Sequence, residues 1–291
     1  MNSRCNADVI RRVAHLFWKL LLAAYAGLLA LIFFGHIVDR LVVFPNHQAI
    51  EADGAQQLLI PSGQGTIEVW KARSPGSKDQ EPAAFILRFV GQGDRAERRA
   101  TSTARQWRAK PVEVWAMNYP GSGGSTGPPR LDELCPSAEQ TYDALRKVAG
   151  QRPVFVQANS LGTAVALCLA TRRPIAGLIL DNPAPLRQVI LDRYGWWNLW
   201  LLAWPASMQI PSRLDAIANA SQSKVPAIMI HSEKDTSIPQ NLQRLVDKAY
   251  QGRKREILVL GAGHMSPLTP EAEVQFSENL EWLWREAYES H

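Results

Sequence analysis

The residue that best combines a reactive group with a constrained setting is Ser160. It lies in Ala158-Asn159-Ser160-Leu161-Gly162, between an apolar run at residues 153–156 and a helix-like run at residues 163–170. A serine between a buried strand and a helix, with small residues two positions before and after it, has the arrangement of a nucleophile elbow. Such a turn raises the hydroxyl above the sheet, so the pattern predicts nucleophilic attack on an acyl carbon. Taken alone, the pentapeptide also fits a serine that only caps the following helix.

A serine hydroxyl is a weak nucleophile near neutral pH, so a base must accept its proton during attack. We predict that His264 is this base. It follows a predicted strand at residues 256–260, and the small residues of Gly261-Ala262-Gly263 would let its imidazole reach across the end of the sheet. His231 ends another predicted strand and is interpreted as structural.

The base in turn needs an acid that holds the imidazole in the correct tautomer. Asp235 is our candidate, because it lies in the polar loop after the predicted strand at residues 227–231. Glu233 in the same loop and Asp181 at the end of the preceding predicted strand are the alternatives. Open α/β sheets gather their functional groups at the carboxyl ends of the strands, where all of these residues are expected.

Two backbone N–H groups are needed to stabilise the oxyanion that forms during acyl transfer. Leu161, directly after the serine, is expected to supply one of them. Gln92 or Gly93, in the turn Gly91-Gln92-Gly93, is expected to supply the other. This turn lacks the Gly-Lys-Ser/Thr of a phosphate-binding loop, so the sequence does not indicate nucleotide hydrolysis.

The sequence predicts neither a cofactor nor a metal site. A second glycine-rich stretch at residues 121–124 leads to Pro128-Pro129 and not into a helix, which makes it a poor dinucleotide fingerprint. The three cysteines, Cys5, Cys135 and Cys168, show no metal-ligand spacing, and we expect no disulfide framework. Cys168 lies in the apolar run after the elbow and is interpreted as a small core residue.

The elements that must position these groups alternate along the chain. Near-continuous apolar runs, typical of strands buried on both faces of a parallel sheet, occupy residues 83–90, 112–117, 154–157, 175–180, 227–231 and 256–260. Helix-like segments occupy residues 96–107, 138–148, 161–171, 241–250 and 273–288. A hairpin precedes them, with its turn at residues 61–65. The alternation indicates an α/β fold.

Together these motifs resemble the α/β-hydrolase superfamily of serine hydrolases, and within it the membrane-anchored, ABHD-like type. The resemblance rests on residues 85–93, residues 117–127, the Ser160 elbow, the Asp235 loop and the His264 loop, which occur in the family order. It implies an α/β-hydrolase fold, with a mostly parallel central sheet, helices on both faces, a small cap and a Ser160–Asp235–His264 triad. Two positions depart from the family pattern: Val90 stands where histidine is frequent, and Ala158 where glycine is usual.

The resemblance places the cap at about residues 183–224, an interval rich in proline and tryptophan. Trp197, Trp200 and Trp204 have the spacing i, i+3, i+7, which predicts one face of a helix. We expect these three side chains to line an acyl pocket or to contact lipid. The alternative is that they only pack on the core.

The N-terminus predicts an uncleaved membrane anchor. Residues 20–38 contain no Asp, Glu, Lys or Arg, and a helix of this length spans about 28 Å, close to the thickness of a hydrocarbon core. A cleaved signal peptide is the alternative, but its apolar core is usually shorter and ends in an Ala-x-Ala-like site. Basic residues that flank a membrane span stay on the cytoplasmic side. Four of them precede the apolar stretch, Arg4, Arg11, Arg12 and Lys19, whereas Arg40 alone directly follows it. We therefore predict a cytoplasmic N-terminus and a catalytic domain on the other side of the membrane.

We therefore predict a tail and anchor at residues 1–40, a juxtamembrane linker at residues 41–54 and a hydrolase domain at residues 55–291. The expected function is cleavage of an ester or thioester of an acyl or lipid-like substrate, by a membrane-attached monomer. A peptidase or acyltransferase on the same fold and a non-catalytic binding protein remain as alternatives. The basic residues of the helix-like segment 94–110 are interpreted as a solvated face, or else as a contact for anionic headgroups. No nucleic-acid-binding motif accompanies them, so a nucleic-acid partner is not expected.

Overall fold

The computed structural model describes residues 2–63, 65–77, 80–197 and 200–289, and the side chains from residue 10 onward. Gln64, in the predicted hairpin turn, lies outside the described residues. So do the first residue of the predicted tail and the last two residues of the predicted hydrolase domain.

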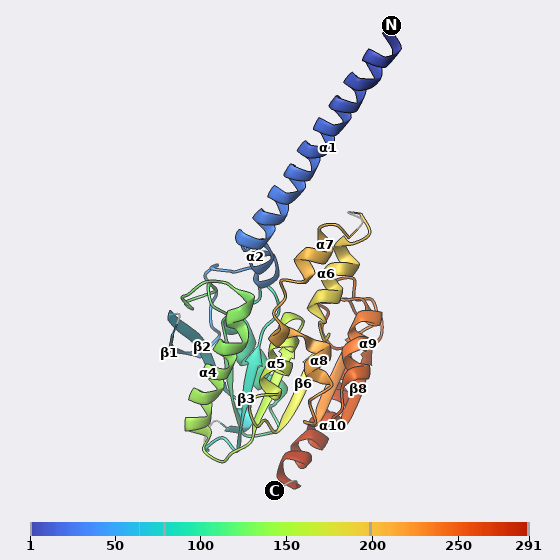
Figure 1. The fold of residues 1–291 in the computed structure, drawn as a ribbon. Helices are drawn as coiled ribbons and strands as arrows, with labels where there is room; N and C mark the ends of the chain where they lie inside the picture. The colour runs from blue at the N-terminus through green and yellow to red at the C-terminus, as the bar shows by residue number, and fades with distance from the viewer. Residues whose placement is uncertain (1, 64, 78–79, 198–199, 290–291) are drawn as a thin grey trace.

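An eight-stranded sheet forms the centre of the molecule, with its strands in the order β1-β2-β4-β3-β5-β6-β7-β8 (Figure 1). The strands are β1 (Gln56–Ser62), β2 (Gly65–Arg73), β3 (Ala84–Phe89), β4 (Val112–Met117), β5 (Val154–Asn159), β6 (Gly177–Asp181), β7 (Ala227–Ser232) and β8 (Lys254–Val259). All neighbours from β4 to β8 are parallel, while β2 is antiparallel to both β1 and β4. The α/β class and the mostly parallel sheet predicted from the sequence are confirmed.

Alternating side chains of the central strands supply two separate apolar cores, because successive residues of a strand point to opposite faces of the sheet. In β3, Leu87 and Phe89 belong to one core and Ile86 to the other. The first core is completed by α4 (Leu131–Ala149), α5 (Leu161–Ala170) and α9 (Gln240–Ala249). The second is completed by α3 (Ala96–Gln106) and α10 (Pro270–Glu289). The sheet is thus covered by helices on both faces, as expected.

A long apolar helix, α1 (Asn2–Phe34), projects away from the domain that holds the sheet (Figure 1). Its segment Ile10–Phe34 is long and apolar enough to cross a membrane, and almost all of it is exposed. The predicted span at residues 20–38 is not a single helix, because α1 ends at Phe34 and His36 takes a left-handed conformation with φ 51°. The break redirects the chain into a short second helix, α2 (Ile37–Val43).

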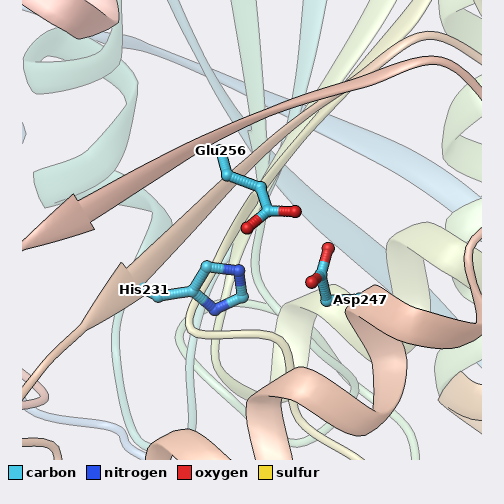
Figure 2. A group of neighbouring side chains, drawn as sticks. All are labelled: His231, Asp247 and Glu256. Atoms are coloured by element: carbon cyan, nitrogen blue, oxygen red, sulfur yellow. The ribbon is translucent and has the colours of Figure 1, made fainter.

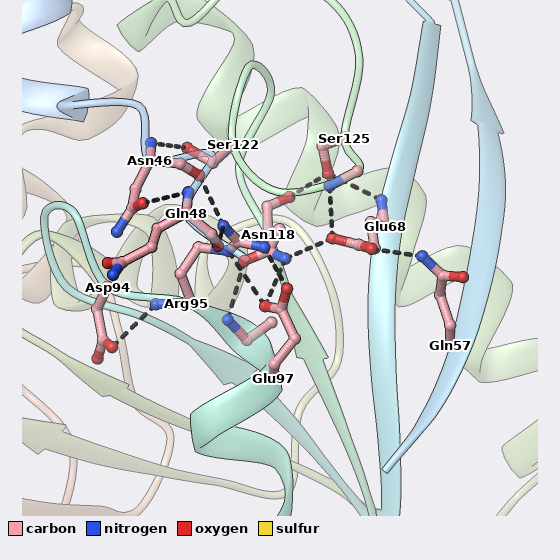
Figure 3. A network of polar contacts seen from close by, with 12 residues as sticks. Asn46, Gln48, Gln57, Glu68, Asp94, Arg95, Glu97, Asn118, Ser122 and Ser125 are labelled. Atoms are coloured by element: carbon pink, nitrogen blue, oxygen red, sulfur yellow. Dashed lines mark hydrogen bonds and ion pairs between the residues drawn. The ribbon is translucent and has the colours of Figure 1, made fainter. Parts of the chain in front are cut away.

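Helix α2 and the residues after it pack on the domain and do not form a free linker. Val38 and Val43 are buried in the first core, and the backbone N–H of Leu131 donates to Asp39 Oδ1 at 2.8 Å. Figure 3 shows how the following residues are held: Arg95 Nη1 donates to the backbone oxygens of Asn46 and Gln48 at 2.9 and 2.8 Å. Residues 41–54, predicted as a juxtamembrane linker, thus contact the domain through these hydrogen bonds.

The cap interval consists of short helices: its first part lies next to the foot of α1, whereas its last helix packs beside α5 and α9 (Figure 1). The elements of the cap are α6 (Leu186–Tyr194), α7 (Ala203–Ser207), the 3₁₀ turn η2 (Ser212–Leu214) and α8 (Ala216–Ala220). Trp197, Trp200 and Trp204 do not share one helix, contrary to the spacing argument. Trp197 lies in a turn, Trp200 has φ 68°, and only Trp204 is helical. Because a residue at positive φ cannot continue a right-handed helix, Trp200 breaks the helix that the tryptophan spacing predicted.

A disulfide joins Cys135 of α4 to Cys168 of α5, with the two Cα atoms 6.2 Å apart. The expectation of no disulfide was wrong. Spacing along the chain gave no sign of the pair, because the two residues are 33 positions apart and meet only when the helices pack side by side. Cys168 is buried in the core as expected, but as a half-cystine.

Candidate active site

The turn between β5 and α5 holds Ser160 in a strained conformation. Its φ and ψ are 52° and −126°, a region that non-glycine residues rarely adopt. Two hydrogen bonds fix this conformation. The Ser160 N–H donates to the Asp181 carbonyl at 2.9 Å, and Thr163 Oγ1 donates to the Ser160 carbonyl at 2.6 Å. A Cβ at Gly162 would lie 2.7 Å from the Phe89 carbonyl oxygen, so this position must be glycine. Ala158 is fully buried within β5, where its methyl group fits.

The structure brings the three predicted triad residues together at the carboxyl ends of β5, β7 and β8. His264 Nε2 lies 3.0 Å from Ser160 Oγ, and His264 Nδ1 lies 2.7 Å from Asp235 Oδ2. Glu233, the first alternative acid, points elsewhere and accepts from the Gly261 N–H at 2.7 Å. Asp181, the second alternative, takes part in the site through its backbone carbonyl.

The Asp235 carboxylate is held by hydrogen bonds on both of its oxygens. Oδ1 accepts from the backbone N–H groups of Ser237 and Ile238, each at 2.8 Å. Oδ2 accepts from Gln243 Nε2 at 3.1 Å as well as facing His264 Nδ1. With Asp235 ionised and accepting, His264 Nδ1 must carry the hydrogen, which leaves Nε2 free to accept the serine proton.

Gln243, on the inner face of α9, is a site residue that the sequence argument missed. Its Nε2 donates to Asp235 and also to the Ile238 carbonyl at 2.8 Å, so its Oε1 faces His231 Nδ1 at 3.0 Å. Burial lowers the pKa of His231, which keeps this imidazole neutral and able to donate from Nδ1. His231 therefore has a structural role, as expected: it orients the Gln243 amide, which in turn holds the Asp235 carboxylate. In the sequence, the available signal was only a polar residue at the helical positions that also carry Leu242 and Val246.

The two predicted oxyanion-hole residues, Gln92 and Leu161, line the same cavity as Ser160 and His264. Leu161 is the first residue of α5, where an N–H has no partner within the helix. The turn that carries Gln92 is pressed against the elbow: a Cβ at Gly91 would lie 3.4 Å from Ser160 Cβ and 2.8 Å from Asn159 Nδ2. The geometry favours neither Gln92 nor Gly93 as the second donor.

The turn at residues 91–93 is also tied to the segment that follows α2. Gln92 Nε2 donates to the Leu41 carbonyl, and Asn46 Nδ2 donates to the Gly93 carbonyl at 2.9 Å. The backbone of Asn46 is held in its turn by Arg95 in the polar network of Figure 3. The segment that follows α2 is therefore part of the framework of the site.

A cavity of about 430 Å³ opens over Ser160 and His264, and its walls are mainly aliphatic. The cap contributes Leu186, Val189 and Ile190 from α6 and Leu202, Ala203 and Ala206 from around α7. The N-terminal segment contributes Ile32, Ile37, Val38, Leu41 and Val42. Of the three tryptophans predicted to bind substrate, Trp197 lines this cavity, whereas Trp200 and Trp204 line a separate groove.

A buried arginine lies beneath the elbow. Arg88 of β3 donates through Nη2 to Asn159 Oδ1 at 2.7 Å, and burial lowers its pKa to about 10. Burial also raises the pKa of Asp181 to about 6, an effect that the charge of Arg88 partly offsets. Arg88 thus holds the side chain of Asn159, the residue directly before Ser160.

One cluster of the described residues has the composition of a metal site, and it lies apart from the triad. His231, Asp247 and Glu256 have potential ligand atoms within 4.8 Å of one another (Figure 2). Both carboxylates already face cations: Lys254 Nζ lies 2.7 Å from Asp247 Oδ1, and Arg244 Nη1 lies 3.2 Å from Glu256 Oε2. The charges balance within the chain, so the cluster is explained as an ion-pair network.

Most basic side chains in the segment 94–110 also form ion pairs. Arg95 is buried against Glu97, Arg99 pairs with Asp94, Arg105 with Asp53 and Lys110 with Glu281. This pattern favours the interpretation as a solvated and partly structural helix over a contact for headgroups.

Comparison with known proteins identifies the class. Residues 80–215 match a family described as serine aminopeptidase, S33. The esterase Pf2001 of Pyrococcus furiosus superposes with a TM-score of 0.62 over 82% of this chain and 96% of its own, at 15% identity. Est1E of Butyrivibrio proteoclasticus gives 0.61 over 79% and 98%, at 13% identity. At such identities the structures show the fold alone. The chain therefore has the α/β-hydrolase fold, and the family match covers somewhat less than half of it.

The relatives by sequence are distant and include ABHD12-like proteins. An uncharacterized protein of Mycobacterium tuberculosis is 28% identical over 239 residues, which are 78% of this chain and 80% of that protein. The lysophosphatidylserine lipase ABHD12 of Danio rerio is 27% identical over 158 residues, which are 48% of this chain and 40% of that protein. The resemblance to the ABHD-like type is thus confirmed as a distant relationship.

Proposed function

We propose that this protein is a membrane-attached serine hydrolase that cleaves an ester or thioester of an acyl substrate. Ser160 attacks the acyl carbon while His264 accepts its proton, and Asp235 stabilises the imidazolium that forms. The imidazolium gives its proton to the alcohol or thiol, which leaves as its bond to the acyl carbon breaks. Water, deprotonated by the same histidine, then attacks the acyl-enzyme and releases the acid and the free Ser160 hydroxyl. The observation that carries the proposal is the contact of 3.0 Å between Ser160 Oγ and His264 Nε2 at the floor of an apolar cavity. Labelling of the native protein, but not of Ser160→Ala, by a fluorophosphonate probe tests it.

The walls of the cavity favour an acyl substrate over a peptide. An aminopeptidase needs an acidic group to hold the positive α-amino group of its substrate. Among the described residues that line the cavity, Asp94 is the one carboxylate, and it is engaged by Arg99. The remaining wall is dominated by aliphatic side chains, whose burial against a hydrocarbon chain is favourable. Peptidase activity, named by the matched family, is therefore the second candidate.

Trp197 is expected to contribute to the binding of longer acyl chains. Because it is half exposed and lines the cavity, Trp197→Ala should raise KM for esters of eight to twelve carbons by about tenfold, equivalent to about 1.4 kcal/mol. Acetyl esters do not reach this wall, so their KM should change little. Trp196→Ala is the matched control, because Trp196 is more exposed and lines neither cavity. Equal losses on short and long esters would mean that Trp197 only supports the cap.

We also propose that α1 is retained as an anchor, with the hydrolase domain on the non-cytoplasmic side. Cleavage in or after α1 would remove part of the cavity wall, since Ile32 and Val38 are buried against the domain and line the cavity. The excess of basic residues before the apolar stretch supports a cytoplasmic N-terminus. The Cys135–Cys168 disulfide supports an oxidising compartment for the domain, because such bonds are rare in the cytosol.

The cysteines provide a test of this topology. Because both half-cystines are buried, isolated membranes are denatured in detergent in the presence of an alkylating reagent, and Cys135 and Cys168 should become labelled only after reduction. Cys5, on the cytoplasmic side in this arrangement, should react at once and serves as an internal control. Replacing both half-cystines by alanine should lower the free energy of unfolding by about 2–4 kcal/mol, as expected for a loop of this size. Immediate alkylation of Cys135 and Cys168 would contradict both the disulfide and the proposed side.

A further inference from the structure

A second apolar cavity lies between α1 and the cap, outside the catalytic cavity. Its volume is about 590 Å³. One wall is formed by Tyr25, Leu29 and Phe33 of α1, and the other by Trp200, Leu201, Trp204, Pro205 and Met208. We call this cavity the anchor groove. Tyr25 Oη donates to the Leu201 carbonyl at 2.8 Å, so the helix and the cap are in direct contact there.

The anchor groove occupies one face of α1. Tyr25, Leu29 and Phe33 follow the spacing i, i+4, i+8, which places them in one row along a helix. Leu28 and Leu31 lie on other faces and are 40% and 57% exposed. All five residues lie within the candidate membrane span Ile10–Phe34. With α1 in a bilayer, the groove therefore opens into hydrocarbon.

The anchor groove and the catalytic cavity share their walls. In the cap, Leu202, Ala203 and Ala206 face the catalytic cavity, whereas Trp204 and Pro205 face the groove. On α1, Ile32 lines the catalytic cavity, whereas the adjacent Phe33 lines the groove. The two cavities are thus neighbours that lie on either side of α7 and meet the same turn of α1.

Building on the proposed function, we propose that the anchor groove receives the acyl chain of a bilayer lipid and delivers its ester to Ser160 from the side of the membrane. The occupant follows from the position of the groove: at this level of α1 the surrounding medium is lipid chains, and every wall residue is apolar apart from the Tyr25 hydroxyl. The exposed cap side chains Trp200, Trp204 and Met208 extend the same apolar surface. The anchor then serves as one wall of the substrate path, in addition to tethering the enzyme.

The first test narrows the groove with a tryptophan. Full-length protein is reconstituted in phosphatidylcholine vesicles that contain monooleoylglycerol, and kcat/KM is measured for this lipid and for the water-soluble p-nitrophenyl acetate. Leu29→Trp should lower the ratio of lipid to acetate turnover at least tenfold. Leu31→Trp is the matched control, because two residues along a helix turn the side chain by about 200°; it should leave the ratio unchanged.

The outcomes separate this inference from the proposed function. An unchanged ratio in Leu29→Trp, or an equal fall in both variants, would overturn the anchor groove as the route. Loss of both activities together in Leu29→Trp would also overturn it, since it would mean that Leu29 only holds the cap. Absence of acetate turnover in the unaltered protein would instead refute the proposed hydrolase.

A second measurement does not depend on turnover. Ser160→Ala protein is placed in vesicles that contain a phosphatidylcholine with a diazirine on its acyl chain, and the products of photolysis are mapped by mass spectrometry. Labels are expected at Leu29, Phe33 and the cap residues Trp204 to Met208 in excess of Leu28 and Leu31. Labels spread evenly around α1 would show a helix that is merely surrounded by lipid, and would overturn the proposal.

Discussion

Ser160→Ala is expected to reduce kcat for a long-chain acyl ester by roughly 10⁴- to 10⁶-fold, the range found when the nucleophile of a serine triad is removed. The substitution takes away the one oxygen that lies 3.0 Å from His264 Nε2. It keeps the Cβ atom and the backbone hydrogen bonds to Asp181 and Thr163 that fix the turn. Thermal unfolding of the variant should therefore resemble that of the unaltered protein. Esterase kinetics with purified full-length protein make the measurement.

His264→Ala should cause a loss of similar size, because serine and histidine act as a unit and the second removal adds little. The double variant should thus be about as slow as either single one. Substantial turnover in Ser160→Ala with a large loss in His264→Ala would point to another nucleophile. Retention of turnover in both would favour the non-catalytic binding protein as the function of this fold.

The elbow could be recognised from the sequence because its determinants are local. The sharp turn at Ser160 requires a small residue at Ala158 and no side chain at Gly162, and both requirements appear within five positions of the chain. Asp235 and His264 could be placed by chain order, because parallel strands bring their carboxyl ends to one edge. The distances that join these residues to Ser160 were not accessible in this way, since they depend on the packing of three loops.

Contacts between distant segments were beyond the sequence argument. Gln243 faces Asp235 only because α9 packs beside the loop after β7, and nothing in the order of residues expresses that angle. The same holds for Cys135 and Cys168, which meet across α4 and α5. The apolar stretch at residues 20–38 looked like one element, yet the left-handed His36 divides it between a helix that leaves the domain and one that enters its core. Composition alone does not locate such a break.

The two functions of the N-terminal segment have a common physical origin. A helix in lipid and a helix on an apolar core both present aliphatic side chains, so one stretch of sequence can pass from the first environment to the second at a single turn. Leu41 and Asn46 then hold the turn that carries Gln92 and Gly93. If α1 is the proposed anchor and this turn supplies the proposed oxyanion donor, membrane attachment and the geometry of the site are linked through this segment.

Asp235→Asn is expected to lower kcat by about 10⁴-fold, because an asparagine amide facing His264 Nδ1 favours the tautomer that carries its hydrogen on Nε2. That tautomer cannot accept the serine proton. Asp181→Asn is the matched control: Asp181 was the alternative acid, and its carboxylate makes no hydrogen bond to His264, whose Nδ1 faces Asp235. Kinetics of the two variants under one set of conditions decide between the acids, and a larger loss in Asp181→Asn would mean that Asp235 is misassigned.

Asp235→Asn and Asp181→Asn also allow the effect on activity to be separated from the effect on the free energy of unfolding. Burial raises the folded-state pKa of Asp181 from 3.8 to about 6, so the folded protein binds the extra proton more tightly than the unfolded chain does. The stabilisation from the protonated group is complete below about pH 4 and is lost as the pH rises through about 6. Unfolding of the native protein between pH 4 and pH 7 should show this decline, and Asp181→Asn should lack it. Asp235→Asn should retain it while remaining inactive, because the carboxyl that titrates is still present and the one that orients the base is not.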